Sequence, residues 1–277
     1  ETARRFADVV AEAVTEDRAL RAVAAAAEFD DVSARADEAD AVRAVLGDAA
    51  DELDPGARKV LAVLRARMTG STPAELQSDA WIVRQNALRL LAALRAIVDR
   101  LGNGADANRV CRIESRVETG VSADAVGLTA IEGVGATRAG TLAVAGYDSP
   151  AAVAAASPEQ LVAAGLSEGV AERVRANAAE LPAVAVEWGE FPDRIDEGQR
   201  RLEEVRVRST AGDARAAVRV TVNGVEMTHK TTYLGETTLP VGVFGNEPGE
   251  LEFAVRVTFP ALPLAPVVRT RTTQVDA

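Results

Sequence analysis

The chain has 277 residues, of which 42 are Asp or Glu and 31 are Lys or Arg, giving a formal net charge of −11. It carries one cysteine and one histidine, which excludes an internal disulfide and a Cys/His metal site. No apolar run approaches the ~20 residues that a membrane span needs, and no secretory signal opens the chain. These features predict a cytoplasmic protein of two or three domains with no membrane partner.

The basic residues are almost all arginine. Lys occurs only at Lys59 and Lys230, and Ala is abundant. An acidic, Lys-poor surface is typical of proteins from salt-loving organisms, in which dense carboxylates keep the protein hydrated. The alternative is an ordinary acidic protein from a high-GC genome. The chain begins at Glu1 without an initiator Met, and we expect it to be a piece of a longer protein.

Residues 1–119 are predicted to be helical. Ala, Leu, Val and Arg recur there at three- and four-residue spacing, with breaks at Gly47, at 54–56 (Asp-Pro-Gly) and at 70–73 (Gly-Ser-Thr-Pro). Charge is uneven along the chain: residues 1–60 hold 15 acids against 8 bases, whereas residues 78–117 hold 4 acids against 7 Arg. The cationic section therefore coincides with the end of the helical region.

The longest helix is predicted within 71–104, "STPAELQSDAWIVRQNALRLLAALRAIVDRLGNG". Thr72 is expected to be its N-cap, Pro73 its first residue and Glu75 the partner in a capping box. Gly102 is expected to end it. About 29 residues at 1.5 Å each give a helix of roughly 43 Å, long enough to cross a domain.

This helix is predicted to have two unlike faces. Its apolar stripe should face a core and consists of Val83, Ala87, Leu90, Leu91, Leu94, Ile97, Val98 and Leu101. The opposite face carries Trp81, Gln85, Arg89, Ala92 and Ala96, flanked by Arg84, Arg95 and Arg100. Aromatic and guanidinium planes over small Ala residues suit stacking of unpaired bases, a contact worth about 1–3 kcal/mol per base. Alternatively, Trp81 packs on another helix or on the β-region, and the arginines form a solvated, salt-bridged face.

Residues 120–182 are predicted to form short helices around a hairpin, "IEGVGATRAG" (131–140). Gly133 and Gly135 allow a tight turn, and the helix that starts near Arg138 can direct backbone N–H groups at a phosphate. A weaker second hairpin, "AAGLSEGVAERV" (163–174), is expected to pair with the first. Because residues 121–180 hold 7 acids against 3 Arg, a packing unit without a ligand is the alternative.

Residues 183–277 are predicted to form a β-sandwich. "ARAAVRVTVNGVEMTHKTTYL" (214–234) alternates in the manner of strands, and its Asn223-Gly224 pair is a type I′ hairpin signal. "ELEFAVRVTFP" (250–260) and "VVRTRTTQV" (267–275) alternate in the same way. Helical periods are missing between these runs, which argues against a parallel α/β sheet.

Nothing in the sequence predicts an enzyme. It contains neither a Gly-x-x-x-x-Gly-Lys-Ser/Thr phosphate-binding loop nor a DExH box. His229 is expected in a strand and Cys111 on a helix, which leaves few candidates for a nucleophile–base pair. We therefore expect no catalytic residue, metal or cofactor in this chain.

Four stretches of the chain occur in the same order as in a known helicase-associated unit. They are "AAAEFDDVSARADEADAV" (25–42), "AELQSDAWIVRQNALRLLAAL" (74–94), "RIESRVETGV" (112–121) and "LTAIEGVGATRAGTLAVAGYDSPAAVAAASPEQLV" (128–162). In them the chain resembles the Sec sixty-three homology unit, which follows the motor in superfamily-two helicases of the Ski and Brr type and in archaeal Hel-type DNA helicases. The resemblance covers essentially the whole chain, the sandwich being matched only by position and strand pattern.

The resemblance implies a three-part architecture. Residues 1–119 would be a helical bundle with a long ratchet helix, residues 120–182 a helix-hairpin-helix domain, and residues 183–277 an immunoglobulin-like or fibronectin-III-like β-sandwich. Together with the acidic, Lys-poor composition, it also implies a haloarchaeal source.

The function implied by the resemblance is that of an accessory unit of an ATP-dependent nucleic-acid helicase, which guides or ratchets a single strand of DNA or RNA and regulates the motor. ATP and Mg²⁺ would belong to motor domains elsewhere in the full-length protein. In the family the ratchet helix contacts bases of the strand that leaves the motor. The matching nucleic-acid-binding positions here are Trp81, Arg84, Gln85, Arg89 and Arg95 on the helix, with Gly133, Gly135 and Arg138 in the hairpin.

A rival interpretation is a protein-interaction scaffold that docks partners to a helicase. In related helicases with two cassettes, the second copy of this unit is similar to a docking platform. Open strand edges of the sandwich would bind such partners.

Overall fold

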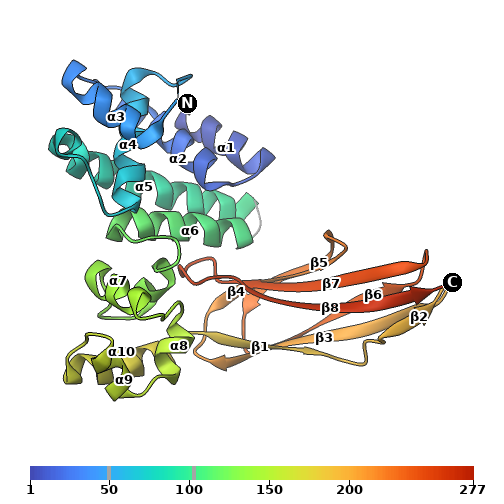
Figure 1. The fold of residues 1–277 in the computed structure, drawn as a ribbon. Coiled ribbons are helices and arrows are strands. Elements are labelled where there is room, and N and C mark those ends of the chain that lie inside the picture. Colours follow the sequence, from blue (N-terminus) through green and yellow to red (C-terminus); the bar gives the residue numbers. More distant parts are fainter. Residues whose placement is uncertain (49–50, 102–103) are drawn as a thin grey trace.

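The structure is a computed structural model that describes residues 1–48, 51–101 and 104–277. Helices occupy the first two thirds of the chain and strands the last third, which confirms the predicted order of α and β sections (Figure 1). The buried apolar residues fall into three clusters, spanning Phe6 to Val117, Val121 to Ala178 and Phe191 to Val275. Each section therefore has a hydrophobic core of its own.

The first section is a bundle of six α-helices among its described residues. They are α1 (Thr2–Glu12), α2 (Glu16–Ala24), α3 (Ala39–Leu46), α4 (Pro55–Met68), α5 (Gln77–Leu101) and α6 (Gly104–Thr119), with 3-10 turns η1 (Ala27–Phe29), η2 (Ala36–Glu38) and η3 (Ala74–Leu76). Two expected breaks are confirmed. Gly47 follows α3 with φ at +59°, and Asp54 precedes α4, whose first residue is Pro55.

The start of α5 differs from the expected one. Thr72 does not cap it: Pro73 caps the 3-10 turn η3 without a side-chain hydrogen bond, and the α-helix begins only at Gln77. The fully buried Leu76 explains the difference, because the tight turn carries its side chain into the core before the helix starts. The helix has 25 residues, or about 37 Å at 1.5 Å each. Gly102, expected to end it, lies outside the described residues.

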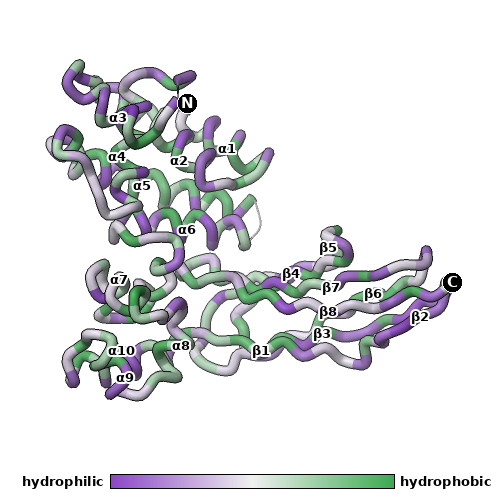
Figure 2. Tube along the Cα trace, in the orientation of Figure 1, coloured by the Kyte–Doolittle hydropathy of each residue, from purple (hydrophilic) through white to green (hydrophobic). Residues whose placement is uncertain are grey.

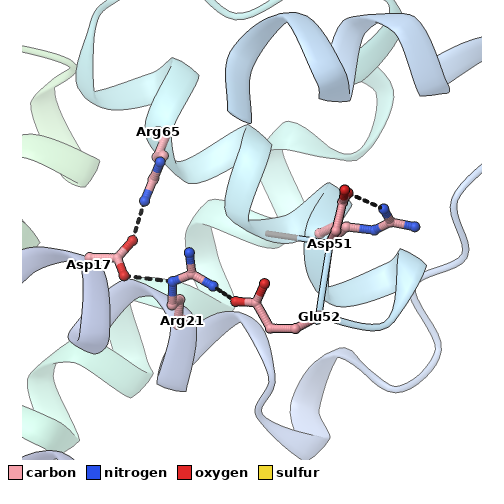
Figure 3. A network of polar contacts seen from close by, with 6 residues as sticks. Asp17, Arg21, Asp51, Glu52 and Arg65 are labelled. Atoms are coloured by element: carbon pink, nitrogen blue, oxygen red, sulfur yellow. Dashed lines mark hydrogen bonds and ion pairs between the residues drawn. The ribbon is translucent and has the colours of Figure 1, made fainter. Parts of the chain in front are cut away.

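Ion pairs join α2 to α4 and to the segment before α4 (Figure 3). Asp17 accepts hydrogen bonds from Arg21, at 2.6 Å, and from Arg65 on α4. Arg21 also pairs with Glu52. Surface ion pairs are worth about 0–1 kcal/mol each and weaken with salt, so this network adds to the apolar core without replacing it.

The second section contains η4 (Val126–Ala130), α7 (Ala136–Val144), α8 (Pro150–Ala155), α9 (Pro158–Ala163) and α10 (Glu168–Ala179). Leu128 and Ile131 beside the first hairpin share one core with Leu166 and Ala171 of the second. The expectation that segment 163–174 packs with the first hairpin is therefore confirmed.

The third section holds two sheets around one core. One sheet has three strands, in the order β1 (Ala183–Trp188), β3 (Arg200–Ala211) and β6 (Glu236–Phe244). The other has five, in the order β2 (Arg194–Asp196), β8 (Val267–Asp276), β7 (Gly249–Thr258), β4 (Arg215–Val222) and β5 (Val225–Tyr233). The two sheets face each other across the shared core. Hydrophobic and hydrophilic residues alternate along these strands (Figure 2). Asn223 and Gly224 connect β4 to β5 with φ at +48° and +78°, which confirms the predicted type I′ turn.

The bundle is docked on the sandwich through α6, which packs against β4 and β7 (Figure 1). The buried Asn108 donates from Nδ2 to three carbonyl oxygens of the segment between β7 and β8, at 2.9–3.1 Å. Gly104 lies so close that an added Cβ would be 2.3 Å from the Cβ of Ala217. Among the described residues, no helix is both long enough and apolar enough to cross a bilayer.

Candidate nucleic-acid interface

The open face of α5 begins at Trp81, which exposes 67% of its surface. Its neighbour Ile82 is 45% exposed. Further along, Arg89 is exposed and Gln85 is half-buried. The structure therefore does not pack Trp81 on another helix or on the sandwich, which was the alternative for this residue. Trp81, Gln85 and Arg89 lie together on the solvent side of α5.

The guanidinium groups of Arg84 and Arg95 form hydrogen bonds to α6. Arg84 donates to the carbonyl oxygen of Glu118 at 3.2 Å. Arg95 Nε donates to the Glu114 carboxylate at 2.9 Å. The structure thus separates the five predicted positions into three on the open face and two that join α5 to α6.

The Glu118 carbonyl lies at the C-terminus of α6, where unpaired carbonyls and the helix dipole favour cations. Arg67 on α4 donates to the same oxygen at 2.9 Å and to the Val117 carbonyl at 3.2 Å. Burial and the neighbouring Arg84 guanidinium lower the pKa of Arg67. Arg84 and Arg67 therefore cap α6 and fix it beside α5.

A buried ion cluster anchors the first turn of α5, two residues before Trp81. Lys59 of α4 is fully buried and donates to Glu38 at 2.8 Å, to the Ser33 carbonyl at 3.2 Å and to Asp79 of α5. Burial alone would lower the pKa of Lys59, but the hydrogen bonds to Asp79 and Glu38 raise it. The cluster therefore fixes the position of the first turn of α5, from which Trp81 projects.

The open face continues to the sandwich. Ala92, Ala96 and Arg95 line a crevice of about 190 Å³ together with Pro260 and Arg215. An ion pair between Arg215 of β4 and Asp99 of α5 closes its far end. Fifteen residues separate Trp81 from Ala96, so the face is about 22 Å long. Arg215 could not be predicted from the sequence, because an arginine that opens an alternating strand is usually solvated.

The hairpin is arranged differently from the open face of α5. Gly133 has φ at +85°, a left-handed conformation that glycine adopts at little cost, and Gly135 is the N-cap residue of α7. Both glycines border open space. Arg138, however, folds back and donates to the Gly133 carbonyl at 2.5 Å, beside the exposed Glu132. The hairpin can offer backbone N–H groups to a phosphate, while the Arg138 guanidinium is held against the turn by its bond to Gly133.

Cys111 and His229 lie on different elements, α6 and β5. Cys111 is buried on α6, and burial raises the pKa of its thiol to about 11, so the nucleophilic thiolate is scarce at neutral pH. His229 lies on β5 with Nδ1 2.7 Å from Glu226. Among the described residues, no group of three or more His, Cys, Asp or Glu side chains is placed to hold a metal ion.

Comparison with known proteins identifies the family. The sequence model of the Sec63 Brl domain matches residues 1–273. The chain belongs to the Sec63 Brl domain family. Because the match spans the helical bundle, the middle section and the sandwich, all three are parts of one Sec63 Brl domain. No curated protein matches the chain.

Three solved structures are distantly similar to this Sec63 Brl domain. A CARDB domain from Pyrococcus furiosus, solved with di-metal ions, is 23% identical over 35% of this chain and 90% of its own, with a TM-score of 0.31. A β-glucosidase from Listeria innocua is 12% identical over 35% of this chain and 16% of its own, with a TM-score of 0.27. A DNA-bound alkylpurine DNA glycosylase from Pseudomonas fluorescens is 13% identical over 99% of this chain and 97% of its own, with a TM-score of 0.24. TM-scores this low establish neither fold nor function.

Proposed function

We propose that this chain is a nucleic-acid-guiding accessory unit of an ATP-dependent helicase, in which a single strand of DNA or RNA lies along the open face of α5. The observation that carries the proposal is the exposure of Trp81. Exposing a large aromatic side chain to water costs free energy, and Trp81 is exposed near the N-terminus of α5 and is not buried in a core.

The face that follows Trp81 suits an unpaired strand. Arg89 is exposed, and its one hydrogen bond within the described residues goes to Asn86, at 2.8 Å, on its own helix. Ala92 and Ala96 leave room for bases beside the helix, and Arg89 supplies charge for the backbone. The Sec63 Brl family membership supports a helicase setting for this face.

The other parts of the helicase proposal concern the middle section and the motor. We propose that η4 and α7, with the second hairpin at 163–174, form the helix-hairpin-helix domain, and that the two sheets form the immunoglobulin-like domain. Since Arg138 is bound to Gly133, the hairpin serves mainly as a rigid joint. ATP hydrolysis with Mg²⁺ would come from motor domains in the same full-length protein.

The test is the binding of labelled single-stranded DNA and RNA oligonucleotides to the full chain at several KCl concentrations. Loss of one stacked base costs about 1–3 kcal/mol, so Trp81→Ala should weaken binding about 5- to 150-fold. Arg89→Ala should weaken it less and reduce its salt dependence. The matched control is Leu202→Ala, which removes another apolar side chain, 74% exposed, from β3 of the sandwich. Unchanged affinity in both α5 variants would contradict the proposal.

A second candidate, a protein-docking scaffold, is favoured by β5. This strand is the edge of its sheet, and its residues are exposed or half-buried along its whole length. Val225, Met227 and Tyr233 are exposed apolar side chains on it. An edge of this kind can accept a strand from a partner. The test is a pull-down from cell extract with the wild type and with Met227→Lys. Docking is supported if a protein binds the wild type and not the variant, and contradicted if both recover it equally.

A further inference from the structure

A second, strongly basic site lies at the seam between α6 and the outer face of the five-stranded sheet. It is a cleft of about 340 Å³ whose lining includes Arg109, Arg112, Arg219 and Arg256, and Asp106 is the acidic side chain among its described lining residues. Two arginines come from α6, one from β4 and one from β7. Four guanidinium groups around one cleft are unexpected in a chain with a net charge of −11.

The sheet side of the cleft places two like charges opposite each other. Arg219 of β4 and Arg256 of β7 are direct partners in the antiparallel ladder. Arg219 is neutralised by Glu226 at 2.8 Å. Arg256 is exposed and forms no ion pair or side-chain hydrogen bond with any other described residue. Like charges directly opposite on a sheet are destabilising, so the fold alone gives no reason for Arg256.

The helix side of the cleft adds one arginine with an ion pair and one without an ion pair among the described residues. Arg109 pairs with Asp106 at 2.5 Å. Arg112 donates to the carbonyl oxygens of Pro263 and Ala123, both at 2.8 Å, and forms no ion pair within the part of the chain that the structure describes. Burial and the charge of Arg116 lower the pKa of Arg112, while the charge of Asp124 acts in the opposite direction. The cleft therefore holds two arginines, Arg112 and Arg256, that form no ion pair with any described residue.

The chemistry of the cleft selects a phosphate. Guanidinium groups offer paired N–H donors that match two phosphate oxygens at once, and the buried Thr258 lies on the same wall. The cleft also adjoins the path along α5. A smaller hollow beside it shares Arg219 and Arg256 with the cleft and Asp99 with the crevice at the end of α5.

We propose that the cleft between α6 and strands β4 and β7 is a phosphate-binding site, with Arg256 and Arg112 as its cations that form no ion pair among the described residues. The phosphate would be that of a nucleic-acid backbone or of a free polyphosphate. The nucleic-acid backbone is favoured, because the cleft continues the path from α5, and this choice of ligand rests on the proposed function. The assignment of the cleft to a phosphate is independent of the proposed function.

The experiment uses the full chain, with labelled oligothymidylate and inorganic tripolyphosphate as separate probes. Arg256→Gln is the test variant. Arg269→Gln is the matched control, because Arg269 is exposed on the neighbouring strand β8 one residue after Val268, the partner of Arg256, and so points to the other face of the sheet. Arg219→Gln is a second test variant, and Trp81→Ala reports separately on the α5 face.

For oligothymidylate, Arg256→Gln should weaken binding on the order of 10-fold at 0.1 M KCl and reduce the slope of log affinity against log salt by about 0.7–1. Arg219→Gln should weaken it less, because Glu226 already neutralises that arginine. Arg269→Gln should change neither quantity.

The two probes and the variants distinguish four outcomes. A loss with oligothymidylate supports the cleft and identifies the backbone as its ligand. A loss only with tripolyphosphate, read as a thermal shift present in wild type and absent in Arg256→Gln, supports the cleft with free polyphosphate as ligand. If neither probe distinguishes Arg256→Gln from Arg269→Gln, the cleft assignment is wrong, and a Trp81→Ala effect would then leave the proposed function standing. If tripolyphosphate binds while neither the labelled DNA nor the labelled RNA oligonucleotide does, the proposed function fails and the cleft survives.

Discussion

Arg219 on β4 and Arg256 on β7 lie directly opposite each other in an antiparallel ladder, and the second of them has no anion beside it among the described residues. The arrangement predicts that Arg256→Gln does not destabilise the fold. We expect its free energy of unfolding to rise by about 0.2–1 kcal/mol at 0.1 M KCl, because a repulsion is removed. Near 1 M KCl the gain should vanish, since the Debye length falls to about 3 Å. Thermal unfolding at both salt concentrations measures this, and a clear loss of stability at low salt would show that Arg256 has a structural partner.

The buried cluster around Lys59 predicts a large penalty when only one member is changed. Lys59→Met leaves the carboxylates of Glu38 and Asp79 near one another without a cation and should cost about 3–5 kcal/mol. The triple variant Lys59→Met, Glu38→Gln, Asp79→Asn removes all three charges and should recover most of that loss. Denaturant unfolding of both variants is the measurement. Equal losses in the two would mean that packing of the lysine stem, and not charge, holds α5.

The same cluster predicts how stability depends on acid. Burial alone would raise the pKa of Glu38, but hydrogen bonds from Lys59 and from the Arg35 backbone bring it below the usual 4.5. The hydrogen bond from Lys59 lowers the pKa of Asp79 below the usual 3.8. Because the folded pKa values are lowered, the stability they contribute is complete above about pH 4.5 and lost as the pH falls through the folded values.

Melting temperatures between pH 7 and pH 3 check this expectation, as the ordinary pKa range of carboxyl groups lies inside it. The wild type should lose more stability on acidification than the triple variant, which has no titratable group in the cluster. Parallel curves for the two proteins would place the acid-sensitive groups elsewhere.

The docking of bundle on sandwich depends on the amide of Asn108. Asn108→Asp keeps the shape but replaces a donor by an acceptor facing the carbonyl oxygens of Phe259, Leu262 and Leu264. Leaving buried polar groups unpaired costs about 1–3 kcal/mol, and more for a charged one. We expect a lower melting temperature for Asn108→Asp than for Asn108→Ala, which adds no charge. The reverse order would indicate that water reaches this contact.

The local signals in the sequence predicted much of the fold. The breaks at Gly47 and Asp54, the Asn223-Gly224 turn and the strands at 250–260 and 267–275 depend on backbone preferences and on alternation over a few residues. The start of α5 was wrong because it depends on the burial of Leu76, a tertiary effect that no capping pattern records.

The candidate sites could be predicted only in part. Trp81 was found because it lies opposite the apolar stripe of its own helix. Arg84 and Arg95 flank the same face, and only the position of α6 shows that they are engaged elsewhere. The arginine cleft was missed because its members, between Arg109 and Arg256, come from a helix and two strands far apart in sequence. Their convergence is a property of the docked domains.

The fluorescence of Trp81 during oligonucleotide binding tests the central claim most directly. The chain has two tryptophans, and Trp188→Phe removes the other one, whose ring packs edge-on against Phe191 at 5.1 Å. If a strand lies along α5, the emission of Trp81 should be quenched, and its access to iodide should fall, over the same concentration range in which labelled oligothymidylate gains anisotropy. An oligonucleotide that binds while the emission and iodide access of Trp81 stay constant would contradict the account.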